Sequence, residues 1–384
     1  MKNIYLDYNA TTPIAPSVQE AMAPFLSEHF GNPSSSHTMG RACSEAIEDS
    51  RSKIASMLGA DVDEIVFTSC GTESNNLALK GVMMRQAPSV GGHLVISAIE
   101  HPAIMVTAKY LEKIGFDLTI VPCNEHGVVQ ANIVENALRP DTLLVSIMHA
   151  NNETGVVQPI RAIAEACHSR DILFHTDAAQ SVGKIRTAVD ELNVDMLTTA
   201  GHKIYSPKGV GVLFVRRGVH LEPIIHGAGH ECGLRAGTEN VPYIVALGRS
   251  ALLASRGLDD AADRLARLRD RLYARLRSAV GPNLTINGAL AERLPNTLSV
   301  NFPKINGYDL LARTPELMAS TGSACHSGNT NVSPTLQAMG LDPEIARGCV
   351  RLSVGWYTSE EDIDKAANLL IAAWESLSEA ENVV

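Results

Sequence analysis

The sequence contains no C-x-x-C pair, and its seven cysteines are an odd number, so a disulfide framework is not expected. It has no apolar run of the roughly 18 residues that a membrane helix needs. The opening residues, MKNIYLDYNATTP, contain no apolar signal core. There is also no internal repeat and no low-complexity segment. Together these absences predict a cytoplasmic protein with reduced thiols and no membrane partner.

Basic residues are fewer than acidic residues in this chain. The 32 Lys and Arg residues face 42 Asp and Glu residues, which gives a formal net charge of −10. A nucleic-acid groove needs clustered Lys and Arg, so direct nucleic-acid binding is not expected. Hydrophobic residues make up 45% of the 384 residues. A chain of this length can form two domains, or one large domain with a smaller cap.

Short apolar runs predict seven strands, at residues 64–69, 93–98, 117–122, 143–148, 172–174, 196–199 and 209–215. Helical stretches separate most of these runs. The predicted fold class is therefore α/β, with a seven-stranded, mostly parallel and doubly wound sheet.

A smaller α/β domain is expected after this sheet. Leucines recur at helical spacing between Leu258 and Val280, which predicts an amphipathic helix with a solvated charged face. The rest of the chain predicts two strands and a closing helix, at 297–302, 350–355 and 359–377. We therefore expect a large domain at 16–255 and a small domain formed by 1–15 and 256–384.

Two of the predicted strands end near residues of opposite charge, Asp177 and Lys203, which are 26 positions apart (203 − 177). Ligands of open α/β sheets bind at the carboxyl ends of the strands. In pyridoxal phosphate chemistry a Lys holds the cofactor as a Schiff base and an Asp pairs with its pyridinium nitrogen. The alternative is a structural Asp and a surface Lys. Because Gln180 and His202 accompany the pair, we favour the cofactor site.

Three motifs carry a resemblance to a known family: HTDAAQ at 175–180, GHKIYSPKG at 201–209 and TGSACHSG at 321–328. With them the chain resembles, nearly end to end, the cysteine desulfurases of the NifS/IscS type, which are fold type I pyridoxal phosphate enzymes. The resemblance implies conversion of L-cysteine to L-alanine, with sulfur passing to a Cys persulfide and then to a sulfur-acceptor protein. It also implies a homodimer.

The cofactor phosphate is expected at the turn between a strand and a helix that carries Gly71 and Thr72, because free N–H groups at a helix start bind anions. The resemblance adds His202, and it adds Thr238 as a residue that reaches the phosphate of the partner subunit. Related chains often have Ser three residues before the Lys, where this chain has Ala200. Phosphate binding must then depend more on Thr72 and His202.

The resemblance also assigns residues around the cofactor ring. His101 would stack on the ring and move protons, a task that suits a pKa near 6.5. Asn152 would contact the ring hydroxyl, although the adjacent Asn151 is an alternative for that role. Asp177 and Gln180 would complete the ring contacts.

The resemblance makes Cys325, in a Gly- and Ser-rich segment of the small domain, the expected catalytic nucleophile, and the alternative is an incidental loop cysteine. Cys43 and Cys167 fall at helical positions and suggest packing, and Cys70 is the next candidate.

The substrate carboxylate is expected to bind Arg351, since a guanidinium suits a bidentate clamp. The alternative is a solvent-facing Arg on an edge strand. Asn32 lines the substrate site by resemblance, or else is an ordinary turn residue.

No metal is expected, because the spacing of His226, His230 and Cys232 fits no common metal pattern. Three other functions stay open: a selenocysteine lyase, an aminotransferase of the same fold, and a non-catalytic sulfur-relay subunit. Intact Lys203, Asp177 and Cys325 argue against the last. The sequence does not name the sulfur acceptor, which could belong to iron–sulfur cluster assembly, tRNA thiolation or another pathway.

Overall fold

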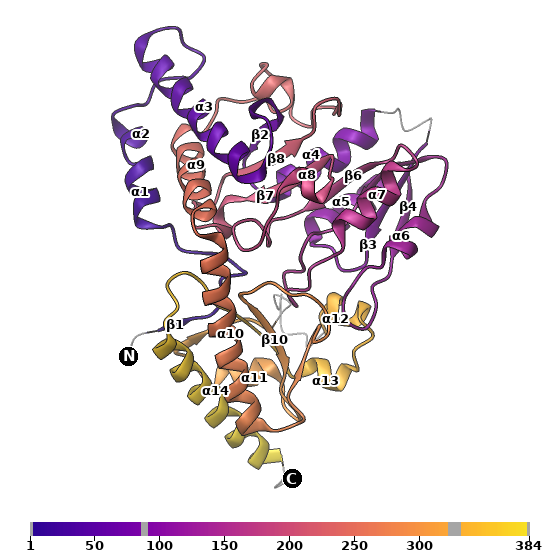
Figure 1. The fold of residues 1–384 in the computed structure, drawn as a ribbon, viewed down its shortest axis with the longest axis vertical. Coiled ribbons are helices and arrows are strands. Elements are labelled where there is room, and N and C mark those ends of the chain that lie inside the picture. Colours follow the sequence, from indigo (N-terminus) through magenta and orange to yellow (C-terminus); the bar gives the residue numbers. More distant parts are fainter. Residues whose placement is uncertain (1–2, 86–90, 322–331, 382–384) are drawn as a thin grey trace.

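The computed structural model describes residues 3–85, 91–321 and 332–381. Its largest sheet has seven strands in the order β2-β8-β7-β6-β5-β3-β4 (Figure 1). Their bounds are β2 Ile65–Thr68, β3 His93–Ser97, β4 Asp117–Val121, β5 Thr142–Ser146, β6 Leu173–Asp177, β7 Met196–Ala200 and β8 Gly211–Val215. Strand β8 runs opposite to the other six strands of this sheet. The predicted seven-stranded, mostly parallel sheet is confirmed.

Helices cover both faces of this sheet because successive side chains of each strand point to opposite faces. Val95 of β3 packs into one core with helices α3, α6, α7 and α9, whereas Leu94 and Ile96 pack into a second core with α4 and α5. These helices span α3 Thr38–Leu58, α4 Gly71–Arg85, α5 Pro102–Lys113, α6 Ala131–Ala137, α7 Ile160–His168 and α9 Val241–Ser255.

A smaller unit lies below the large sheet in Figure 1. It has an antiparallel sheet in the order β12-β10-β9 and a parallel pair of β1 with β11. One hydrophobic core joins these strands to helices α10, α11 and α14. The bounds are β1 Ile4–Tyr5, β9 Thr285–Ile286, β10 Thr297–Asn301, β11 Leu317–Met318, β12 Cys349–Ser353, α10 Leu258–Val280, α11 Gly307–Ala312 and α14 Glu360–Glu381.

Helix α10 begins and ends at the residues predicted for it, and its buried face is formed by leucines at helical spacing, Leu265, Leu268, Leu272 and Leu276. The remaining helices are short: α1 Pro16–Met22, α2 Pro24–Ser27, α8 Val189–Leu192, α12 Pro334–Ala338, α13 Pro343–Arg347, and the 3-10 turns η1 Val62–Glu64, η3 Gly201–Lys203 and η4 Glu231–Gly233. None of the helices in the described ranges is long and apolar enough to cross a bilayer.

Loops that carry most of the predicted site residues leave the carboxyl ends of neighbouring parallel strands. Strand β6 ends at Asp177, β7 ends three residues before Lys203, and β3 ends four residues before His101. Residues 7–12 run between the two sheets. Asp7 forms a bridge with Ser353 of β12, and the N–H of Thr12 donates to the carbonyl of His202. The N-terminal segment therefore meets both units at the edge where a ligand would bind.

Candidate active site

Lys203 lies in the 3-10 turn η3, directly after β7, and its amine reaches the N-terminal segment. Its Nζ donates to the carbonyl oxygens of Asn9 at 2.5 Å and Ala10 at 2.9 Å. Both acceptors are backbone groups, so the amine is held without a direct carboxylate partner.

The electrostatic environment of Lys203 favours a neutral amine more than water does. Burial and the positive charge of Arg351 lower the pKa of Lys203 to about 8, against the opposing carboxylates of Asp177 and Asp7. An amine with such a pKa is partly unprotonated near neutral pH, and it can act as a nucleophile and as a proton carrier.

Asp177 is the last residue of β6 and is buried. Its Oδ2 accepts a hydrogen bond of 2.7 Å from Nδ2 of Asn75 in α4, and its Oδ1 accepts one of 2.9 Å from the N–H of Ala179. No ion pair to Asp177 occurs within the described residues. A buried carboxylate without a cationic partner is expensive, so this position suits a cationic ligand group.

Two histidines flank this lysine and aspartate. His101 caps helix α5, where its Nδ1 accepts from the N–H of Ala103 at 3.1 Å, so the neutral ring carries its proton on Nε2. His101 counts as an exposed residue, yet the surrounding protein lowers its pKa through desolvation; Asp177 opposes this shift and Lys203 adds to it. His101 can therefore exchange a proton close to both charged groups.

His202 is held more firmly. Its Nδ1 lies 3.1 Å from Oγ1 of Thr11, and its carbonyl accepts from the N–H of Thr12. Burial, with the nearby Lys203 next, lowers the pKa of His202 to about 4, so the ring is neutral at physiological pH. A neutral ring can donate a hydrogen bond without adding charge to the site.

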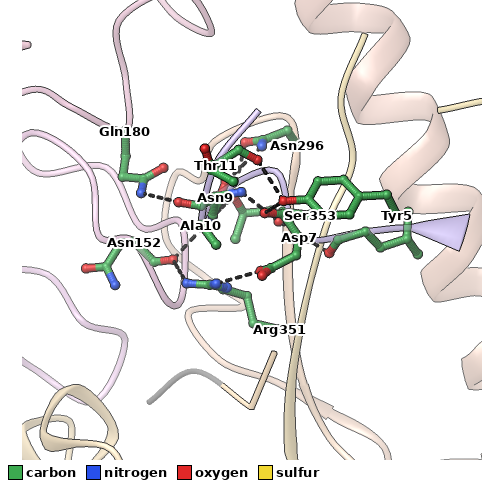
Figure 2. Close-up of polar contacts among 12 residues, drawn as sticks. Tyr5, Asp7, Asn9, Ala10, Thr11, Asn152, Gln180, Asn296, Arg351 and Ser353 are labelled. Carbon is green, nitrogen blue, oxygen red and sulfur yellow. Dashed lines mark hydrogen bonds and ion pairs between the residues drawn. The ribbon is translucent and has the colours of Figure 1, made fainter. Parts of the chain in front are cut away.

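Gln180 connects two parts of the cluster. Its Nε2 donates to the carbonyl of Asn9 at 2.9 Å (Figure 2). Lys203 contacts the same oxygen. Its Oε1 accepts from Nζ of Lys184 at 3.1 Å. Lys184 is buried, and desolvation, with Lys203 next, lowers its pKa to about 7.

Arg351 of β12 is buried, so the alternative of a solvent-facing arginine is wrong. Its Nη1 donates to the carbonyl of Asn152 at 3.0 Å, and its Nη2 pairs with Oδ1 of Asp7 at 2.7 Å (Figure 2). The Nε–H is buried and has no partner within the ranges described. Two of the five guanidinium N–H groups are therefore engaged at the point where the small sheet meets the large one.

The two neighbouring asparagines differ in how their side chains are used. The Oδ1 of Asn151 accepts from the N–H groups of Glu153 and Thr154, and its Nδ2 donates to the carbonyl of Ile99. Asn151 therefore shapes its own turn. The amide of Asn152 is half-buried and makes no hydrogen bond with the described residues, so it is the one of the two with free capacity for a ligand.

The helix α4 starts beside the lysine loop. A Cβ at Gly71 would lie 3.2 Å from the Cβ of Ala200, so a close approach of α4 to the end of β7 depends on glycine. Thr72 is exposed. The first N–H groups of a helix have no acceptor within it, which leaves this turn able to bind an anion.

Asn32 and Thr238 are not brought to the Lys203 cluster. Both are exposed, and no hydrogen bond in the described chain joins either one to that cluster. The Oδ1 of Asn32 accepts from the N–H of Ser34 and so shapes a turn. The segments carrying these residues face one another across a hollow of about 720 Å³, which is lined by Pro33, Ser34, Ala228, Gly229, His230 and Glu239, among others.

Cys325 lies outside the described residues, but both flanks of its segment are anchored beside the site. The N–H of Arg351 donates to the carbonyl of Ser320 at 2.7 Å. On the other side, the hydroxyl of Ser333 donates to the carboxylate of Glu153, which follows Asn152 in the chain. Cys43 and Cys167 are buried in the core, as expected for packing.

Four residues of the cluster had no predicted role: Asp7, Asn9, Asn75 and Lys184. Polar Asp7 and Asn9 alternate in the sequence with apolar Leu6 and Tyr8, which are buried, although residues 8–10 form a turn rather than a strand. That pattern is the signal that could have identified them. Lys184 lies four residues after Gln180, and one lysine among 32 basic residues gives no comparable signal.

Comparisons with known proteins agree with this geometry. The family described as aminotransferase class-V matches residues 4–366. A protein named cysteine desulfurase IscS from Dictyoglomus turgidum is 44% identical over 371 residues, which cover 96% of this chain and 94% of the relative. Cysteine desulfurase IscS 1 from Archaeoglobus fulgidus is 44% identical over 375 residues, which cover 97% of each chain.

Solved structures with the same fold include a NifS-like protein, which aligns with a TM-score of 0.90 and 39% identity over 98% of this chain and 99% of its own. A structure described as SspA in complex with cysteine aligns with a TM-score of 0.82 and 39% identity, over 93% of this chain and 100% of its own.

Proposed function

This chain belongs to the class-V aminotransferase family, and from that premise we propose that it is a pyridoxal phosphate-dependent cysteine desulfurase. The substrate is L-cysteine and the products are L-alanine and a sulfur atom carried as a persulfide on Cys325. The observation that carries this proposal is that Lys203, whose pKa is lowered to about 8, and the buried carboxylate of Asp177, which forms no ion pair with the described residues, lie at one sheet edge. Full-length relatives that carry the name cysteine desulfurase support it.

The residues present fit pyridoxal phosphate. The buried carboxylate of Asp177 has no cationic partner in the described part of the chain, and a protonated pyridine nitrogen would supply one. Lys203 would hold the cofactor covalently. The start of α4 at Gly71 and Thr72, together with His202, would bind its phosphate, and Gln180 and Asn152 would contact its ring. When bound, the cofactor withdraws electrons from bonds at the substrate α-carbon.

The protein residues then divide the work. Arg351 binds the substrate α-carboxylate through N–H groups that its contacts with the described residues leave free, Nε–H among them. Lys203 accepts the α-proton at Nζ, and His101 exchanges protons at Nε2. The thiolate of Cys325 attacks the substrate sulfur. An S–S bond forms on Cys325 as the substrate C–S bond breaks, and the carbon that loses sulfur gains a proton to give alanine.

We also propose that the enzyme is a homodimer in which Thr238, and with it Asn32, completes the site of the partner subunit. Two observations support this. Both side chains are exposed, and their segments line one hollow on the surface of this chain rather than the Lys203 cluster. We further propose a cytoplasmic location, since six described cysteines are free thiols, and a scaffold or sulfur carrier of iron–sulfur cluster assembly as the acceptor.

A division into a large domain at 16–255 and a small domain at 1–15 and 256–384 belongs to the same proposal. It is supported by the core of the smaller unit, which contains Ile4 and Leu6 and otherwise draws on residues from Leu265 onward. Helix α9 ends at Ser255 and α10 begins at Leu258, so the boundary falls between two helices.

Substitution of Cys325 by Ser tests the function. The variant should still bind the cofactor, because the residues that hold it lie elsewhere. A hydroxyl is almost never ionised and cannot carry a persulfide, so production of alanine and sulfide from cysteine should fall to background. Mass spectrometry of the wild type after cysteine should find one added sulfur on the Cys325 peptide.

Cys70→Ser is the matched control and should keep the wild-type rate. Undiminished turnover by Cys325→Ser, or added sulfur on Cys70, would show that the nucleophile is misassigned. Parallel assays with cysteine and selenocysteine distinguish a cysteine desulfurase from a selenocysteine lyase. A lyase would release selenide from selenocysteine faster than it releases sulfide from cysteine. Transamination without sulfide release would identify an aminotransferase.

A further inference from the structure

The ion pair between Asp7 and Arg351 is built differently from the ion pair between Arg51 and Glu231 in the same chain. Arg51 and Glu231 form two parallel contacts of 2.8 Å, from Nη1 to Oε2 and from Nη2 to Oε1. Arg351 instead gives Asp7 a single contact through Nη2, and its Nε–H stays buried without an acceptor in the residues described. Buried N–H groups seldom lack an acceptor unless a ligand or water supplies one.

The position of Asp7 is fixed by its own segment. Its backbone bridges Ser353 of β12, and its carbonyl accepts from the N–H of Ala10 at 2.9 Å and from the hydroxyl of Tyr5 at 3.1 Å (Figure 2). The side chain is partly open, with an exposed fraction of 18%. A carboxylate on a fixed turn can hold a guanidinium in one place while leaving its other edge free.

We infer that Asp7 is a positioning residue for substrate binding: it holds Arg351 by Nη2, together with the carbonyl of Asn152 at Nη1, and so fixes the guanidinium, whose Nε–H has no acceptor in the described residues, for an incoming amino-acid carboxylate. This inference rests on the proposed function, because it takes Arg351 as the carboxylate clamp. Without Asp7, the guanidinium would keep one of its two contacts and its free N–H would no longer be directed.

The charge of Asp7 has a second consequence, at Lys203. Arg351 lowers the pKa of Lys203 and Asp7 raises it by a smaller amount, so Asp7 offsets part of the effect of the guanidinium charge on the lysine. The other charged or titratable groups near the lysine are Asp177, Lys184, His101 and His202. Loss of the Asp7 charge should therefore lower the pH at which the lysine nitrogen loses its proton.

Two substitutions distinguish the hydrogen bond by which Asp7 positions Arg351 from the effect of the negative charge of Asp7. Asp7→Ala removes both, whereas Asp7→Asn keeps an oxygen acceptor for Nη2 and removes only the charge. Measured by calorimetry on the holoenzyme, the Kd for L-alanine should rise roughly ten- to a hundredfold in Asp7→Ala and clearly less in Asp7→Asn. In both variants the pH midpoint of the visible absorbance of the lysine-bound cofactor should fall. The control Asp364→Asn, which breaks an exposed ion pair with Arg271, should change neither.

A double-mutant cycle distinguishes positioning from general support of the fold. If Asp7 acts through Arg351, then adding Asp7→Ala to Arg351→Ala should weaken alanine binding no further. Additive losses, or an unchanged Kd together with an unchanged pH midpoint in Asp7→Ala, would overturn the inference. Alanine binding and the pH midpoint do not depend on turnover. A wild type that fails to release sulfide from cysteine would therefore refute the proposed function and leave the inference on Asp7 testable.

Discussion

The two ends of the candidate site differ in how far this chain completes them. One end, around Lys203 and Asp177, is the lysine end, which we also call the closed end. There Asn9 is only 1% exposed, and it bonds Lys203 and Gln180 on one side and Thr297 and Asn296 on the other. The other end is the one where we propose that the cofactor phosphate binds, which we call the phosphate end or open end. There Thr72 is exposed at the start of α4. Thr238, which resemblance assigns to the same phosphate, is also exposed and makes no hydrogen bond to the cluster within the described residues.

This difference separates the part of the site that one folded chain forms by itself from the part that is completed only when a ligand or a second subunit binds. The lysine end is a polar network between the two sheets, so its geometry follows from folding of a single chain. The phosphate end offers free N–H groups and hydroxyls, which bind an anion only when one arrives. We expect substitutions at the closed end to change chemistry and substitutions at the open end to change assembly and cofactor retention.

The largest effect is expected from Asp177→Asn, at the closed end. The substitution keeps the shape of the side chain but removes the charge that would hold a pyridine nitrogen protonated. An ion pair near 4 Å in a partly buried site contributes about 4 kcal/mol, so turnover of cysteine should fall roughly a thousandfold. Steady-state sulfide production and the visible spectrum of the holoenzyme measure this.

The control is Asp195→Asn, which removes another buried carboxylate from the opposite end of the same sheet. Asp195 accepts from the N–H of Phe174 and contacts His168, so this variant tests general loss of a buried acid. It should lose stability and keep turnover per folded molecule. Equal loss of turnover in both variants would mean that Asp177 has no special role in the chemistry and acts only as a buried acid of the sheet.

Much of this fold could be predicted because its elements follow local patterns. Helix α10 was placed correctly since leucines at helical spacing lie between Gly257 and Gly281. Strand β6 was predicted too short, because its polar His175 is buried: Nδ1 contacts Ser146 and Nε2 contacts Thr198 on the neighbouring strands. Burial lowers the pKa of His175 to about 3, so it is a neutral member of the sheet.

The site was predictable only in part. Asp177 and Lys203 could be placed together, since parallel strands put their carboxyl ends at one edge. The role of Asn9 could not, because its partner Thr297 is 288 residues away and no local pattern joins them. The burial of Arg351 depends on the same long-range meeting of β12 with the N-terminal segment, through the contact with Asp7.

At the open end, a smaller effect is expected from mixed dimers of Lys203→Ala with Thr238→Ala. If Thr238 completes the partner's site, one site of the mixed dimer carries both lesions and the other carries none. The mixed dimer should then reach about half of the wild-type activity per dimer, because subunit sharing restores one complete site. Sulfide production by dimers purified with two different tags measures this. Activity equal to the mean of the two parent variants would mean that each chain builds its site alone.

The smallest change in turnover is expected from Lys184→Met, which is an exception among closed-end substitutions because it tests that end through stability rather than through chemistry. Lys184 is buried with Gln180 as its hydrogen-bond partner, and burial lowers its pKa from 10.5 to about 7. Between these two pH values the unfolded chain binds more protons at this lysine than the folded chain does. Wild-type stability from this group therefore rises with pH across the window, by about 1.4 kcal/mol per pH unit at most.

Urea midpoints of wild type and Lys184→Met, measured at about pH 7 and about pH 9, test this sign. Below the folded pKa the wild type carries the full penalty of a buried ammonium, so the Met variant should compare most favourably with it near pH 7. Its advantage should shrink by roughly 2 kcal/mol toward pH 9. Lys109→Met, an exposed lysine on α5, should show no such trend. If the difference in urea midpoint between wild type and Lys184→Met is the same at both pH values, the pKa of Lys184 in the folded protein is not lowered from its value in water.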